Sequence, residues 1–139
     1  MAIRSPDYSD VYKDCPVVKT LSTSITTTGT ATVWTPASGK RFRLKYISIV
    51  SAISTTLAGT GVQLNFYDNA VGGSALIWPI AVFAANQAAF ASLTTGSPIL
   101  LPTPGILSAA ANNALIIGCD ATISTGKIQL AVVVGGTEE

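Results

Sequence analysis

Short runs of β-branched and aromatic residues, separated by turn residues every eight to twelve positions, constrain this chain more than any other feature. From residue 17 onward, Thr, Val and Ile are frequent, and apolar and polar residues alternate with the period of two that is typical of strands. Only the alanine-rich residues 84–93 would also suit a short helix, and nothing nearby caps one. The sequence therefore predicts an all-β fold, an antiparallel β-sandwich or jelly roll of seven to nine strands.

The longest predicted strand, residues 41–53, combines an apolar and a basic face. Phe42, Leu44 and Tyr46 should share one face, and Arg41, Arg43 and Lys45 the other. The apolar positions then shift to Ile47 and Ile49, which indicates a bulge or burial on both faces. The other strands are expected at 17–25, 30–34, 61–68, 74–83, 84–93, 113–123 and 126–135, with 98–107 as a proline-punctuated edge or loop.

Within these strands the alternation predicts which side chains face the core. Val62, Leu64 and Phe66 should point inward, and Gln63 and Asn65 outward. Pro79 should confine residues 74–83 to an edge or break the run, because proline cannot donate to a β-ladder. In the last strand, Ile128, Leu130, Val132 and Val134 should align on one side.

Residues 1–16 differ from the rest of the chain. They hold Tyr8, Tyr12, three aspartates and two prolines, and show no apolar period. Proline favours extended geometry at the residue before it, so the segment is predicted to be an extended N-terminal arm, with a frayed terminus as the alternative. The two tyrosines favour an arm that docks, because aromatic anchors are common in interfaces. Residues 17–139 then form one β-sandwich domain.

Charge is scarce and unevenly distributed. Only 11% of residues are charged, and four of the eight basic residues lie between positions 40 and 45, whereas no residue between Asp68 and Asp120 is charged. The net charge of +1 gives no global attraction to nucleic acid or to an anionic membrane. A surface so poor in charge favours a chain that is covered by copies of itself or by a larger assembly.

The basic cluster has three possible roles. It can simply solvate an outer face, it can dock against an acidic protein, or it can bind nucleic acid. Nucleic acid fits least, because only four cations are available and the alternation puts the aromatic rings on the opposite face. The predicted partner-binding residues are Lys40, Arg41, Arg43, Lys45, Tyr8 and Tyr12.

The residues needed for catalysis or metal binding are not apparent. The chain has no histidine and no phosphate-binding or nucleophile motif, and its two cysteines, Cys15 and Cys119, are expected to be reduced thiols rather than metal ligands. Asp68 and Asp120 follow strands beside small residues, as turn-forming aspartates do. We expect no enzyme, cofactor or metal site. Residues 75–93 are long enough to span a membrane but are interrupted by Pro79 and polar residues, and no signal peptide is visible.

Several segments resemble a known group of proteins. "VWTPASGKRFRLKYISI" at 33–49, the "L-x-F-Y-D" strand ending at Asp68, and "GSPILLPTPGILSAAANNALIIG" at 96–118 are similar to small β-sandwich virion proteins of tailed bacteriophages. The resemblance implies a jelly-roll-like fold, trimers or other oligomers, attachment to the capsid lattice, and no catalysis. It carries over no individual functional residue.

Together these observations favour a capsid decoration protein, made in the host cytoplasm and located on the virion, with itself and the major capsid protein or another virion protein as partners. The alternative is a carbohydrate- or receptor-binding module of a phage tail, in which Trp34, Trp78 or Tyr67 would stack on sugar rings. A hydrolase is the third alternative, but this chain has no histidine and no evident pair of carboxylates facing each other across a cleft.

Overall fold

The computed structural model describes residues 15–26, 29–58, 61–72, 75–83, 93–95, 99–121, 123 and 125–139. These residues form ten strands, three of which are only two or three residues long, against the seven to nine expected. The strands are β1 (Val17–Ile25), β2 (Thr30–Trp34), β3 (Phe42–Ala58), β4 (Val62–Asp68), β5 (Leu76–Phe83), β6 (Leu93–Thr95), β7 (Ile99–Leu100), β8 (Ile106–Leu107), β9 (Leu115–Cys119) and β10 (Thr125–Glu138). No described segment is a long apolar helix of the kind that crosses a bilayer.

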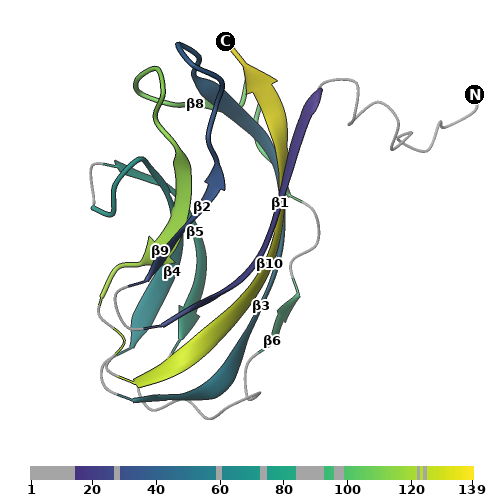
Figure 1. Ribbon diagram of the computed structural model, residues 1–139. Helices are drawn as coiled ribbons and strands as arrows, with labels where there is room; N and C mark the ends of the chain where they lie inside the picture. The colour runs from purple at the N-terminus through teal and green to yellow at the C-terminus, as the bar shows by residue number, and fades with distance from the viewer. Residues whose placement is uncertain are drawn as a thin grey trace, which may run out of the picture.

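The strands form two antiparallel sheets that pack face to face, which confirms the predicted β-sandwich (Figure 1). One sheet has the order β1-β10-β3-β6, with β7 and β8 also paired to β3, and the other has the order β2-β9-β4-β5. The core between them holds the inward residues of both sheets, including Phe42, Leu64, Phe66 and Phe83. The jelly-roll connectivity stays a prediction.

A bulge in β3 explains the shift of its apolar positions. Leu44 pairs with Gly136 and Tyr46 with Gly135, so Lys45 is the extra residue in β3. Phe42 and Leu44 are buried before the bulge, and Ile47, Ile49 and Ile53 are buried after it. The expectation that Tyr46 shares the core face is therefore wrong, because the bulge turns it to the outer face of the sheet.

The other alternation predictions can be compared with burial directly. The inward sets of β4 and β10 are buried as expected, and β5 lies at the edge of its sheet with a register shift next to Pro79. Asn65, expected to point into solvent, is only 2% exposed. Asn65 Nδ2 donates a hydrogen bond to Tyr67 Oη at 2.9 Å, and the side chains of Thr30 and Val71 lie close to Gly118, the residue of β9 that pairs with Asn65.

Residues 98–107 were expected to be an edge or loop, and their described part is a proline-containing edge beside β3. β7 and β8 pair with β3 on either side of the bulge, and Leu101 N donates to Lys45 O at 2.9 Å between them. Gly105 has a positive φ of 87°, and a Cβ there would lie 2.5 Å from Leu44 O, so only glycine lets the loop approach β3 so closely. Residues 1–14 of the arm predicted at 1–16, and most of the predicted strand at 84–93, lie outside the described residues.

Candidate interface at the charged end of the sandwich

The beginning of β3 and the end of β10 lie side by side and hold most of the described charge. Glu138 pairs with Phe42 and Thr137 with Arg43. Beyond the strand ends, Arg41 N donates to Glu139 O at 2.8 Å, and Glu139 N donates to Arg41 O at 2.9 Å. The last residues of the chain are therefore fixed against the start of its basic segment. We call this region, residues 40–45 with 137–139, the charged end.

Glu138 ties the end of β10 to the loop that precedes β3. Its carboxylate accepts a hydrogen bond from Trp34 Nε1 at 2.9 Å and another from Ala37 N at 3.1 Å. These two bonds, with smaller effects of Lys19 and Lys40, lower the pKa of Glu138 below its ordinary value. Trp34 itself is 1% exposed and packs against Phe42, so the bond links the charged end to the core.

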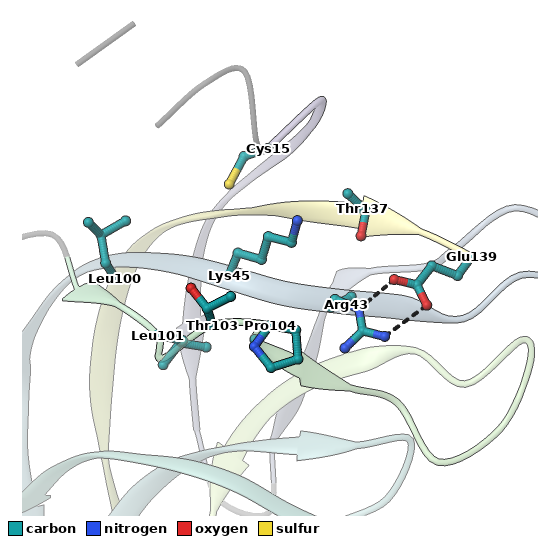
Figure 2. Close-up of a pocket in the computed structure, with 10 residues that line it drawn as sticks. Cys15, Arg43, Lys45, Leu100, Leu101, Thr103, Pro104, Thr137 and Glu139 are labelled. Atoms are coloured by element: carbon teal, nitrogen blue, oxygen red, sulfur yellow. Dashed lines mark hydrogen bonds and ion pairs between the residues drawn. The ribbon is translucent and has the colours of Figure 1, made fainter. Parts of the chain in front are cut away.

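Glu139 pairs with Arg43 on the solvent side of the same strands. Arg43 Nε contacts Glu139 Oε1, and Arg43 Nη2 donates to Glu139 Oε2 at 2.9 Å, in a bidentate arrangement (Figure 2). The hydrogen bond to Arg43 lowers the pKa of Glu139, and the same bond raises the pKa of Arg43. Arg43 is thus engaged within its own chain.

The other predicted partner-binding cations differ in their surroundings. Arg41 donates through Nε to Ser108 O at 2.7 Å, and its Nη2 contacts the same oxygen, so this guanidinium also binds a group of its own chain. Lys40 is exposed at the turn before β3. Lys45, at the bulge, lines a pocket. The structure brings these four cations to one end of the sandwich, while Tyr8 and Tyr12 lie outside the described residues.

The pocket beside Lys45 has a volume of about 720 Å³ and lies between β3, the end of β10 and the 100–105 segment (Figure 2). Its lining combines apolar and polar side chains, as ligand pockets commonly do. Leu100, which is 62% exposed, and Pro104 lie on one side, and Arg43 and Glu139 mark one end. Cys15, the first described residue, also lines it and is buried. The full lining is Cys15, Arg43, Lys45, Leu100, Leu101, Thr103, Pro104, Gly105, Thr137 and Glu139.

A second surface was not predicted from the sequence. The outer face of the six-stranded sheet carries no charged side chain along the regularly paired parts of β1, β10 and β3, where the register and the alternation of side chains define it. Val18 is 44% exposed and Val50 is 40% exposed on this face. We call it the uncharged face: Val18, Thr20, Ser22 and Ser24 of β1, Gln129, Ala131, Val133 and Gly135 of β10, and Tyr46, Ser48, Val50 and Ala52 of β3.

The residues considered for other activities are occupied or buried. Trp34 is 1% and Tyr67 is 2% exposed, so neither offers a ring face to a sugar, and Trp78 packs partly against the core. Asp68 accepts from Ser108 Oγ at 2.9 Å and from Ala109 N at 2.6 Å, and Asp120 accepts from Gln63 N at 2.6 Å, so both aspartates bind their own chain next to a strand end.

The described cysteines and carboxylates suggest no metal site. Neither Cys15 nor Cys119 forms a disulfide, and burial raises the pKa of Cys119 to about 11, so Cys119 is protonated at neutral pH. Among the residues that the structure describes, no group of three or more cysteine, aspartate or glutamate side chains is placed to hold a metal ion.

Comparison with known proteins gives little further information. No family model and no curated protein matches the chain. One similar solved structure is the cyanophage Pam1 capsid asymmetric unit, at 25% sequence identity over 87% of this chain and 84% of that chain, with a TM-score of 0.44. A TM-score this low does not establish a common fold, so the likeness carries no functional conclusion.

Proposed function

We propose that this chain is a structural protein of a tailed-phage virion, and that it decorates the capsid lattice as an oligomer, with a trimer as the expected state. The observation that carries the proposal is the uncharged face. Interface cores are depleted in charged residues, and a soluble chain rarely leaves so much surface without charge unless neighbours cover it. The sequence resemblance to small phage virion proteins supports the same function.

The composition of the uncharged face fits contact with protein rather than with a small molecule. Its Ser, Thr, Ala and Gly side chains are short, so the backbone of a neighbour can approach closely, and the exposed Val18 and Val50 supply apolar area. Val133 and Ala131 continue that area across the middle strand. A surface of this kind can be buried without desolvating any ion, which is the main cost of burying charged groups.

The basic residues play a smaller part in this proposal than the sequence alone indicates. Arg41 and Arg43 already donate to Ser108 and Glu139 of the same chain, so an acidic partner would have to compete with those groups. Lys40, exposed at the turn before β3, is the cation that we assign to contact with a neighbouring virion protein. As an exposed charge it is expected to affect the rate of association more than the affinity.

Co-sedimentation with capsid shells that lack this protein tests the proposal. We expect the purified chain to bind the shells, and Val50→Glu to weaken binding by about tenfold or more, because burying one unpaired carboxylate costs more than about 1.4 kcal/mol. The matched control is Val82→Glu, which puts the same charge on an exposed valine of the other sheet, where Val82 is 75% exposed. This control should bind like the wild type.

Light scattering of the free protein provides the second measurement. An oligomer, or shell binding that Val50→Glu disrupts and Val82→Glu does not, supports the proposal. A chain that stays monomeric at high concentration and does not sediment with shells contradicts it. Equal loss of binding in the two variants would mean that the uncharged face is not the contact surface.

A further inference from the structure

In the part of the chain that the structure describes, the two sheets have four edges, and these differ in how far they can pair with another strand. The edge strand β5 contains Pro79 and two register shifts, and β2 is five residues long with one shift. The third edge, beside β3, is formed by β6, β7 and β8, which are three, two and two residues long. Short strands, bulges and prolines are common means of preventing association between sheet edges.

The fourth edge, β1, has none of these three features. Its nine residues pair one for one with β10, without a register shift, and include no proline. Among the described strands, β10 is the one hydrogen-bonded to β1, so the other side of β1 has no neighbour. Every second residue of such an edge strand directs its backbone N–H and C=O groups away from the sheet, where they can pair with another chain.

We infer that this edge pairs with the same edge of a second copy, so that two β1 strands run antiparallel about a two-fold axis at Leu21. Leu21 is the middle residue of β1, and this register therefore uses all nine residues. Main-chain hydrogen bonds join the two six-stranded sheets into one, with both uncharged faces on the same side. The contact goes beyond the proposed function, since a two-fold pairing joins two copies and does not itself close the expected trimer.

The side chains of β1 favour this register, because similar residues meet when the strand is paired with itself. On the inner face, Leu21 lies opposite Leu21 of the second copy, and Val17 lies opposite Ile25, so apolar side chains meet. On the outer face, Thr20 lies opposite Ser22, and pairs of hydroxyl side chains are also favourable across strands.

The position of Lys19, the one charged residue of β1, supports the same register. With the axis at Leu21, Lys19 lies opposite Thr23 of the second copy. An axis at Lys19 would place the two lysines opposite each other, which is destabilising. An axis at Thr20 or Ser22 would shorten the pairing and place Leu21 opposite a polar residue, Lys19 or Thr23.

Disulfide trapping between two variants of the full chain tests the register. Copies with Thr20→Cys are mixed with copies with Ser22→Cys and oxidised, and peptide mass spectrometry identifies which sulfur atoms are joined. We expect a disulfide between positions 20 and 22, because directly opposite Cα atoms lie about 4.5–5.5 Å apart. Either variant alone should give at least about fivefold less crosslink, because its two cysteines are then diagonal neighbours roughly 7–8 Å apart. The matched control, Thr20→Cys mixed with Ser48→Cys on an interior strand of the same face, should give none.

Sedimentation velocity of charge variants measures the contact itself. Thr20→Lys/Ser22→Lys places lysines opposite each other in the pair, and should raise the dissociation constant of the pair by about fivefold or more. Thr20→Lys/Ser22→Glu instead places opposite charges there, and should restore the wild-type value to within about twofold. Ser48→Lys adds a charge to the same face away from the edge and should leave the constant unchanged. Wild-type circular dichroism in all variants excludes unfolding as the cause.

Three results would overturn the inference. They are a chain that stays monomeric at high concentration, disulfides that form equally well in the unmixed variants, and equal weakening of the pair by Ser48→Lys. The last result would place self-association on the uncharged face instead of on the edge. None of these measurements involves capsid shells, and the proposed function is tested by shell binding and its dependence on Val50, so the two can fail independently.

Discussion

The charged end and the uncharged face are built on the same two long strands, β3 and β10, yet their side chains behave in opposite ways. At the charged end, Glu138, Glu139, Arg41 and Arg43 all bind groups of their own chain. On the uncharged face, a few residues further along the same strands, Ser48, Val50 and Ala131 are uncharged, and each is half-buried or exposed.

This difference indicates that the charged side chains at the ends of β3 and β10 mainly hold these segments to neighbouring parts of the chain, rather than keep the surface hydrated. Most soluble domains spread ions over the whole surface, because ions keep the surface hydrated and discourage association. In the described parts of β3 and β10, charged side chains cluster at the charged end, where the two strands are held together. On the outer face of the regularly paired part, the side chains are uncharged. The uncharged face is then free of the desolvation cost that ions would add to assembly.

The largest expected effect concerns the backbone contact that brings the two strands together at the charged end. A Cβ on Gly136 would lie 1.8 Å from Arg43 O, so Gly136→Ala must push β10 away from β3 at the bulge. We expect the free energy of unfolding in urea to fall by about 3 kcal/mol or more, as for severe overpacking.

The neighbouring glycine provides the control for this prediction. Gly135 lies on the uncharged face, where the nearest atom to a Cβ would be Cβ of Cys15 at 3.2 Å, and the nearest backbone atom would be Val17 O at 3.6 Å. Gly135→Ala should cost about 1 kcal/mol or less. If both variants lose the same free energy of unfolding, the close approach of Gly136 to Arg43 O does not contribute specifically to stability.

A moderate effect is expected from the bond between Trp34 and Glu138. Trp34→Phe keeps an aromatic ring in the core but removes the donor to the carboxylate, so the free energy of unfolding should fall by about 2 kcal/mol. Trp78→Phe, at a partly buried position of β5 in the same four-stranded sheet, should cost about 1 kcal/mol or less. If both variants lose the same free energy of unfolding, the hydrogen bond between Trp34 and Glu138 makes no measurable contribution to stability.

Much of the fold follows from local pattern. The period of two placed the inward residues of β4 and β10 correctly, and Pro79 marked an edge strand because a ring nitrogen cannot donate. The apolar shift within residues 41–53 indicated a bulge, which the register confirms. What the alternation alone could not locate was the extra residue, so Tyr46 was assigned to the wrong face.

The candidate site was less predictable, because it depends on contacts between distant parts of the sequence. Trp34 and Glu138 are 104 residues apart, and Arg43 and Glu139 are 96 residues apart. Nothing local in the basic segment shows that its arginines are already bound within the chain. The uncharged face was missed for the same reason, since it forms only when β1, β10 and β3 align.

The smallest expected effect is the pH dependence of the charged end. The folded chain lowers the pKa of both Glu138 and Glu139, so their contribution to stability is fully present above the ordinary glutamate pKa of about 4.3. It decreases as the pH falls through the lower folded values, because protonation removes the charge that binds Trp34, Ala37 and Arg43. Stability should therefore fall on acidification.

The double variant Glu138→Gln/Glu139→Gln separates this effect from other titrating groups. It should be less stable than the wild type at neutral pH, and the two stability curves should converge as the pH is lowered below the ordinary glutamate pKa and through the lower folded values. Molar salt should reduce the difference, because both carboxylates are close to solvent and screened.

Ser22→Ala on the uncharged face should instead give a curve parallel to the wild type, since no described strand residue there titrates near this pH. If the double variant also runs parallel to the wild type, the two glutamates do not hold the end of the chain, and the contrast between the charged end and the uncharged face is one of composition alone.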